Sequence, residues 1–284
     1  MRRKFTQQEI QLAINLYNNE KQQWEIAREL NCSQTAISDI LRRNHIKTRV
    51  GKKITYTDIN INFFNKINSE EGAYFLGFLY ADGCVQIKNN AYTVSLKLKS
   101  NDQIIIEKFR DIMSPSSPIK ITKNKGSTNT YSYFRVNQKE ICDQLISHGC
   151  VPNKSLILEF PTTIPKKLIH HFMRGYSDGD GSIYKNKLQK SPTSKPYINT
   201  IWKFVSTKQF CEQTAKILKE ELDITCSQSL SRPKTNQITT TLSVGGNLQV
   251  RKALDWLYKD ATIYLPRKYE KYLEFINSIN NKSG

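Results

Sequence analysis

The sequence predicts an α+β protein built from two pseudo-symmetric αββαββα repeats, with a small all-α domain ahead of them. A short pattern that ends in Asp-Gly occurs twice, at residues 75–83 and 173–181. Each copy is followed by the same order of strand and helix patterns, as expected of an internal duplication. Residues 6–43 differ, because their apolar side chains recur only at helical spacing.

Pattern and composition divide the chain further. We expect the helical domain over residues 1–50, a basic linker over 51–69, the first repeat over 70–166 and the second over 167–284. The chain has 43 Lys and Arg against 25 Asp and Glu, which gives a formal net charge of +18. Because so basic a protein attracts polyanions, nucleic acid is the expected partner. With 38% hydrophobic residues the chain can bury a core, which excludes a disordered protein.

The cysteines and the N-terminal residues indicate the compartment. The six cysteines form no C-x-x-C pair and show no zinc-ligand spacing. The start Met-Arg-Arg-Lys-Phe is followed by no apolar segment of a secretion signal, and no stretch reaches the ~18 apolar residues of a membrane span. We therefore expect a reduced intracellular protein with no membrane partner. With no Cys at the start and no His-Asn at the end, we do not expect an intact intein.

The first fifty residues predict a cluster of short helices. Thr6 followed by Glu9 is a capping box, so a helix should begin there. Two further helices are expected over residues 24–30 and 34–43. Asn31 lies in the turn between them, where Asn tolerates the left-handed backbone conformation.

The last two of these helices resemble the helix-turn-helix of resolvases and transposases, whose second helix contacts DNA bases. The residues that would contact bases or phosphates are Gln34, Thr35, Ser38, Asp39, Arg42, Arg43, Lys47 and Arg49. The alternative is a three-helix packing module that does not bind DNA. The basic run over residues 42–53 favours DNA, and a solvated linker is its other interpretation.

Alternating side chains predict the strands of the first repeat. In residues 84–88 and 92–99, apolar residues alternate with polar and basic ones. One sheet face should therefore be apolar, and the other should present Lys97 and Lys99 to DNA, with Arg135 as a further candidate. The rest of the repeat is expected as a helix over 102–113, strands over 119–122 and 131–136, and a helix over 138–148.

The second repeat should follow the same order. We expect strands over 182–184 and 197–205, a helix over 207–222, strands over 225–230 and 237–244, and a helix over 247–258. Residues 185–196 are then a loop, in which Lys185 and Lys187 either contact phosphates or move freely. Thr239 and Thr241 should lie on one face of the last strand, because they alternate with residues of the opposite face. Their hydroxyl groups suit a hydrogen-bonded interface with DNA.

Each motif copy predicts a helix that ends beside an acid, Asp82 in the first and Asp180 in the second. The C-terminal end of a helix carries partial negative charge and unpaired carbonyl oxygens. A carboxylate there is unfavourable unless a cation lies beside it. The duplication therefore predicts a pair of acids that share a cation.

These motifs, the strands after each, and the basic charge together resemble the LAGLIDADG homing endonucleases, in the single-chain form with two motif copies. The resemblance implies a site-specific endonuclease that hydrolyses both strands of a long, asymmetric double-stranded DNA target. It also implies a monomer with internal pseudo-two-fold symmetry, whose strands form a saddle on the DNA. Two letters depart from the family pattern, because Tyr80 replaces an acid and Arg174 replaces a small residue.

Small residues support a close contact between the two motif helices. They stand four positions apart in each helix, Gly77 with Ala81 and Gly175 with Gly179. Such stripes let two helices pack closely, so the two helix ends should converge.

The resemblance implies a metal site at this point. Asp82 and Asp180 would bind divalent metal, and the carbonyl oxygens of Ala81 and Gly179 would be further ligands. Hard oxygen ligands of this kind suit Mg²⁺. The metal would activate water and neutralise charge on the scissile phosphate.

The family also places a lysine near each acid. The candidates are Lys154 and Lys268, with Arg267 competing for the second position. Two alternatives to a nuclease remain open, a DNA-binding regulator that has lost catalysis and an intron RNA-binding maturase. Both motif acids are present, which favours the nuclease over the regulator.

Overall fold

The structure is a computed structural model that describes residues 5–48, 56–123, 126, 128–189, 191, 193–231 and 238–280. The chain divides into two compact units, residues 1–55 and 56–284. Arg49, a predicted phosphate contact, lies outside the described residues. Within the described part of the chain, no helix is both long enough and apolar enough to cross a membrane.

The described part of the first unit contains three helices, α1 (Gln7–Asn18), α2 (Gln23–Glu29) and α3 (Gln34–Arg43). The predicted capping box is present at the start of α1. The Glu9 amide donates to Thr6 Oγ1 at 3.2 Å, and the Thr6 amide donates to Glu9 Oε2 at 2.8 Å. Asn31 has a φ of +46°, as expected of Asn in a tight turn. The helices enclose a small core of their own that includes Ala13, Ile26 and Leu41.

The second unit contains two sets of helices and strands in the same order. The first set is α4 (Glu70–Ala81), β1 (Gly83–Lys88), β2 (Ala91–Lys99), α5 (Gln103–Met113), β3 (Lys120–Lys123), β4 (Thr130–Val136) and α6 (Lys139–Ser147). The second set is α7 (Ile169–Asp180), β5 (Ser182–Leu188), β6 (Tyr197–Ser206), α8 (Lys208–Leu222), β7 (Ser227–Ser231), β8 (Thr239–Gly245) and α9 (Asn247–Tyr258). Short 3₁₀ helices add η1 (Ser100–Asp102), η2 (Lys154–Leu156) and η3 (Lys166–Leu168).

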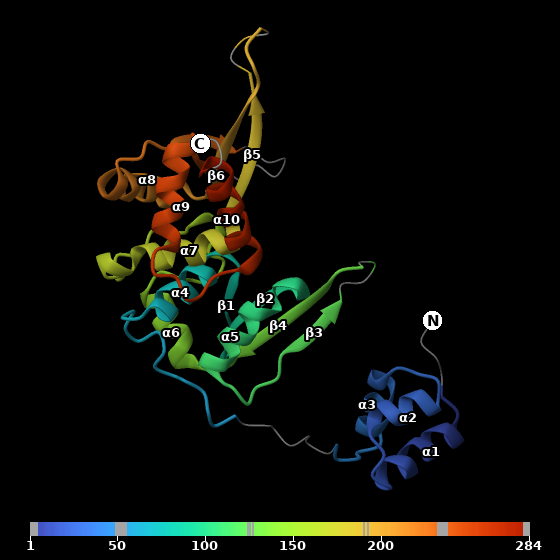
Figure 1. The fold of residues 1–284 in the computed structure, drawn as a ribbon. Helices are drawn as coiled ribbons and strands as arrows, with labels where there is room; N and C mark the ends of the chain where they lie inside the picture. The colour runs from blue at the N-terminus through green and yellow to red at the C-terminus, as the bar shows by residue number, and fades with distance from the viewer. Residues whose placement is uncertain are drawn as a thin grey trace. The chain divides into compact units, whose positions relative to one another are not determined.

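Each set forms one antiparallel four-stranded sheet (Figure 1). The strand orders are β1-β2-β4-β3 and β5-β6-β8-β7, so the topology confirms the predicted duplication and the α+β class. Apolar side chains from one face of each sheet, such as Leu96 and Phe134 in the first and Trp202 and Leu242 in the second, belong to one continuous core. The opposite face of each sheet, which carries exposed residues such as Lys97 and Val205, is called the free face below.

The motif helices α4 and α7 lie side by side where the two repeats meet (Figure 1). A Cβ atom added to Gly77 would lie 1.9 Å from the Phe172 carbonyl oxygen. The reciprocal contact is equally close, since a Cβ on Gly175 would lie 1.9 Å from the Tyr74 carbonyl oxygen. The predicted stripes of small residues are therefore the contact surface, and only glycine fits there.

The sequence did not predict helix α10 (Pro266–Asn280). Lys268 and Phe275 are buried in this helix, and Tyr272, Ile276 and Ile279 pack against the core at the same helical spacing. Residues 56–69 also differ from the expected linker over 51–69, because Phe64 and Ile67 are buried in the core of the second unit. The first helix of the second unit thus follows a packed segment of the chain.

The loop expected over 185–196 is shorter in the structure, because β5 continues to Leu188 and pairs with β6. Figure 1 shows the long hairpin that these two strands form. Lys185 pairs with Thr200 and Lys187 pairs with Ile198. Backbone hydrogen bonds join paired strands whatever their side chains are. The polar residues at the outer end of this hairpin can therefore form a strand without an alternating sequence pattern.

Candidate active site

The two motif acids lie at the C-terminal ends of the paired helices α4 and α7. Asp82 is the residue that caps α4, and Asp180 is the last residue of α7. A Cβ atom on Gly179 would lie only 3.3 Å from Asp82 Oδ2 and 2.3 Å from the Ala81 Cβ. The acid of one helix is therefore packed against the backbone of the other, which brings both acids into one site.

The electrostatics of the site favour a bound cation. Desolvation raises the pKa of Asp82, and it raises the pKa of Asp180 to about 6, with the negative charge of Asp82 as the next cause. Both side chains reach solvent, so water screens part of this effect. Among the described residues, neither carboxylate has a hydrogen bond or an ion pair. Each also stands at the negative end of a helix dipole.

Both predicted lysines lie beside the acids. Lys268, in the first turn of α10, donates from Nζ to the carbonyl oxygens of Ser177 at 2.6 Å, Gly179 at 3.2 Å and Gly181 at 2.7 Å. Burial lowers the pKa of Lys268 to about 8. Lys154, in η2, is buried as well, and its Nζ donates to the Gly83 carbonyl oxygen. The structure thus brings together one acid and one lysine from each repeat.

Arg267 has a different position from Lys268. Its Nε donates to Asp102 Oδ1 at 2.9 Å and its Nη2 donates to Asp102 Oδ2 at 3.0 Å. Asp102 belongs to the first repeat, so this ion pair joins the two repeats near the acids. Sequence reasoning missed Asp102, because a lone acid at the start of a helix carries no signal of a distant partner.

The oxygen atoms at this site suit a hard divalent cation. Asp82 and Asp180 supply carboxylates, and the carbonyls of Ala81 and Gly179 lie at the same helix ends. Among the described residues, no group of three or more His, Cys, Asp and Glu could hold a metal. Any ion bound here would therefore need carbonyl, water or phosphate oxygens to complete its shell, which is how Mg²⁺ is usually held.

The free face of the first sheet carries the predicted basic residues. Ser95 pairs with Arg135, Lys97 with Tyr133, and Lys99 with Tyr131, and paired residues project to the same face. The Lys97 Nζ lies 4.9 Å from the centre of the Tyr131 ring. Lys97, Lys99 and Arg135 are all exposed on this face, as the alternation predicts.

The second sheet divides the predicted contact residues between its two faces. Thr241 pairs with Val205 and shares the free face with Lys203, whose Nζ lies 4.9 Å from the centre of the Tyr184 ring. Thr239 follows the same alternation. Lys185 instead has the register of Thr200, which is buried on the opposite face.

Lys187 also follows the register of that opposite face. Lys203 and Tyr184 instead lie together on the free face of the second repeat. Period-two alternation along residues 197–205 could have identified Lys203, because Trp202 and Phe204 flank it as core residues.

The DNA-contact candidates of the first unit lie on two sides of α3. Thr35, Asp39 and Arg43 line a hollow of about 820 Å³, next to Phe5 and Ile10 of the same unit.

Gln34, Ser38 and Arg42 form the neighbouring stripe of the helix. Gln34 and Arg42 are exposed, whereas Ser38 is half-buried. Arg42 Nη2 lies 2.8 Å from Asp39 Oδ1, so this pair neutralises part of the positive charge. Lys47 is exposed beyond the helix.

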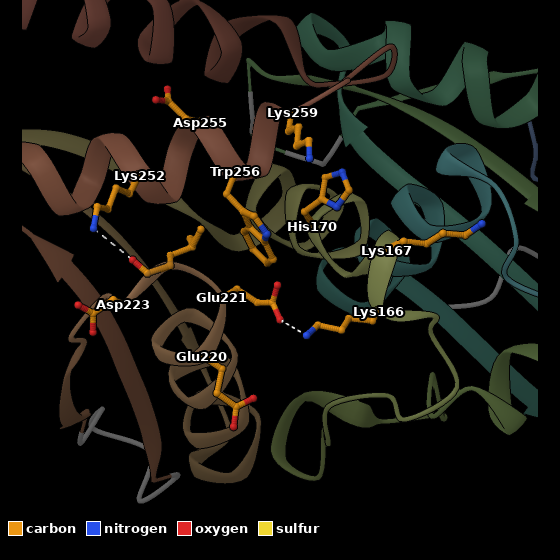
Figure 2. Close-up of a pocket in the computed structure, with 11 residues that line it drawn as sticks. Lys166, Lys167, His170, Glu220, Glu221, Asp223, Lys252, Asp255, Trp256 and Lys259 are labelled. Carbon is orange, nitrogen blue, oxygen red and sulfur yellow. Dashed lines mark hydrogen bonds and ion pairs between the residues drawn. The ribbon is translucent and has the colours of Figure 1, made fainter.

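A larger cavity of about 1100 Å³ lies away from the acids, among α7, α8 and α9 (Figure 2). Its charged side chains have both signs, and Figure 2 shows Lys166 pointing at Glu221, with Nζ 2.7 Å from Oε1. Lys252 Nζ donates to the Leu222 carbonyl oxygen at 3.3 Å. This cavity therefore lacks the uniform positive charge that a polyanion needs.

Comparison with solved structures identifies the fold. The crystal structure of the I-SmaMI meganuclease bound to uncleaveable DNA matches with a TM-score of 0.53 at 13% identity, over 74% of this chain and 91% of that one. The I-LtrWI LAGLIDADG homing endonuclease bound to target DNA matches with a TM-score of 0.51 at 12% identity, over 78% of this chain and 92% of that one. The chain has the fold of the LAGLIDADG homing endonucleases.

Sequence comparisons are less specific. No family model matches the chain. A segment of 181 residues is 25% identical to the DNA-directed RNA polymerase subunit Rpo1C of Methanocaldococcus jannaschii, over 60% of this chain and 20% of that protein. A segment of 131 residues is 30% identical to the probable translation initiation factor IF-2 of the same organism, over 44% of this chain and 10% of that protein. The chain thus spans a fifth or less of either relative.

Proposed function

We propose that this chain is a site-specific, divalent-metal-dependent endonuclease that cleaves both strands of duplex DNA as a monomer. The observation that carries the proposal is the convergence of Asp82 and Asp180 at the ends of α4 and α7, where neither acid has a partner among the described residues. The strand β1 begins at the residue after Asp82, and β5 begins two residues after Asp180. DNA lying along the free faces of both sheets would pass over the acids.

The residues of the site have distinct roles in this proposal. Asp82 and Asp180 hold the cation through their carboxylates. A bound Mg²⁺ would lower the pKa of a water nucleophile and neutralise charge on the phosphate. Lys154 and Lys268, whose amines are fixed on backbone carbonyls, add positive charge beside each scissile phosphate.

The two sheet faces and the first unit would share the binding of a long target. Lys97, Lys99, Arg135 and Lys203 contact phosphates or base edges from the sheets. The helices of the first unit would lengthen the contacted site through Gln34, Arg43 and Lys47.

Lys203 offers a test of which sheet face binds DNA. Lys203→Ala should weaken binding to duplex DNA and lower the slope of log K against log salt concentration by about one phosphate contact. Lys185→Ala is the matched control, because that lysine is exposed on the second sheet but follows the opposite face, whereas Lys203 is half-buried on the free face. Fluorescence anisotropy at several salt concentrations measures both. Equal losses for the two variants would show that the free face is not the interface.

The test of the function is selection of cleaved sequences from a randomised duplex library. With Mg²⁺ present, we expect double-strand cuts at one family of long, non-palindromic sites, and none when EDTA removes the ion. Binding of a specific duplex without cleavage would instead support a DNA-binding regulator. Tighter binding of intron RNA than of duplex DNA at one salt concentration would support a maturase.

A further inference from the structure

Tyr80 and Asp178 hold equivalent positions, two residues before the motif acids, and both are almost fully buried. Their chemistry is unlike, since one is a phenol and the other a carboxylic acid. We infer that each is the positioning residue for the lysine of its own repeat, Tyr80 for Lys154 and Asp178 for Lys268. The consequence for cleavage rests on the proposed function, while the positioning itself can be tested without it.

Asp178 holds the start of α10. Its Oδ2 accepts a hydrogen bond from the Leu265 amide at 2.7 Å and another from the Tyr74 hydroxyl at 2.9 Å. The Leu265 carbonyl oxygen in turn accepts from the Lys268 amide at 2.9 Å, in the first turn of the helix. The carboxylate thus fixes the backbone from which Lys268 reaches the three carbonyls at the end of α7.

Two neighbouring side chains fix the residues just before Leu265. Arg174, which is fully buried one turn before Asp178, donates from Nε to the Ile263 carbonyl oxygen at 2.9 Å. Glu70 Oε1 accepts from the Thr262 amide at 2.7 Å. These contacts explain why an arginine replaces a small residue in the second motif, since its side chain points to the segment that leads into α10. Asp178 is the last of these contacts before Lys268.

Tyr80 makes the corresponding contact as a hydrogen-bond donor, whereas Asp178 is an acceptor. Its hydroxyl donates to the His148 carbonyl oxygen, in the turn after α6. A Cβ on Gly149 would lie 2.3 Å from that hydroxyl, and Gly149 has a φ of +91°. Glycine is therefore needed for the turn to approach the phenol. The chain then leads to Lys154, which donates to the Gly83 carbonyl oxygen beside its own acid.

The two contacts are separate, so each lysine can be released without the other. Tyr80→Phe removes one hydroxyl and keeps the ring in the core. Asp178→Ala removes both acceptors of its carboxylate, and Asp178→Asn keeps one oxygen that can accept from Leu265. The asparagine variant should therefore lie between the parent and the alanine variant.

Lysine labelling of the full chain tests the positioning directly. Reductive methylation followed by mass spectrometry of the peptides measures how often each amine leaves its partners. In the parent, Lys154 and Lys268 should react far more slowly than the exposed Lys187. Tyr80→Phe should raise the labelling rate of Lys154 about fivefold, the effect of one lost hydrogen bond, and leave Lys268 unchanged, while Asp178→Ala should do the reverse.

The strand-resolved cleavage rate gives the functional consequence. On a duplex labelled on both strands, Tyr80→Phe should slow the strand that Lys154→Ala slows, and should add nothing in the Lys154→Ala background. If the substitutions changed the labelling of both lysines alike, or of neither, the positioning would be disproved. If each substitution changed the labelling of its own lysine alone but slowed the cleavage of both strands equally, the positioning would be upheld. That result would count against the proposed catalytic roles of the lysines. If Asp178→Ala does not fold, Tyr80→Phe and Asp178→Asn decide alone.

Discussion

Asp82→Asn and Asp180→Asn are each expected to lower the rate of double-strand cleavage by about a thousandfold or more, because an amide cannot hold the divalent ion as a carboxylate does. Binding of the target duplex should remain, since the acids are not among the residues of the sheet faces. Single-turnover cleavage of a supercoiled plasmid and binding by anisotropy measure the two properties.

The stability of the same variants supplies the control. In the folded state the pKa of Asp180 is raised from 3.8 to about 6, so the ionised carboxylate destabilises the fold at neutral pH. This penalty is complete above the folded pKa and disappears as the pH falls below the unfolded pKa. Asp180→Asn should therefore unfold at the same or a higher temperature than the parent at pH 7 without metal, and the gain should be about 1 kcal/mol at most because water screens the exposed side chain.

A large loss of thermal stability in Asp180→Asn would contradict this account of the site. Mg²⁺-dependent cleavage that persisted in both variants at the parental rate would falsify the proposed function. Loss of cleavage with normal folding and binding is the combination that the structure predicts for a metal-binding acid.

The helices and strands that sequence reasoning found are those with strong periodicity. Leu96 and Leu98 alternate with Lys97 and Lys99, and the strand β2 has the predicted inward and outward faces. Helix α10 was missed although Tyr272, Phe275, Ile276 and Ile279 recur at helical spacing, because the first buried position of the helix holds a charge, Lys268, instead of an apolar residue. A pattern of hydrophobicity cannot show a buried charge that is held by carbonyl oxygens.

In the site, too, features marked by a local sequence pattern could be predicted, and contacts between distant segments could not. The pair Asp82 and Asp180 could be predicted because both stand at a defined point of a repeated local pattern. Lys185 was assigned to the interface from its charge alone, and the pairing register of β5 shows that it follows the opposite face. The contact of Arg267 with Asp102 depends on how two distant segments meet, which no local pattern contains. The net positive charge indicates that the protein binds a polyanion, whereas strand register and packing decide which charged residues face it.

Gly77→Ala should destabilise the fold strongly, because the contact of α4 with α7 leaves no room for a methyl group. The new Cβ would lie 1.9 Å from the Phe172 carbonyl oxygen and 2.9 Å from the Tyr176 amide nitrogen, both of which belong to the backbone of α7. Because backbone atoms cannot turn aside as a side chain can, the two helices must separate. We expect a loss of about 3 kcal/mol or more in the free energy of unfolding, measured by urea denaturation.

Gly72→Ala in the same helix is the matched control. A Cβ there would lie 3.4 Å from Ser69 Oγ, an ordinary contact, so its stability should equal or exceed that of the parent. Cleavage should distinguish the variants even more sharply. Separation of α4 from α7 draws Asp82 away from Asp180, so any Gly77→Ala protein that still folds should have lost cleavage of both strands together. A site shared by two helices cannot tolerate a shift of one helix relative to the other. A folded Gly77→Ala protein with parental cleavage would therefore show that the position of the acids does not depend on this contact.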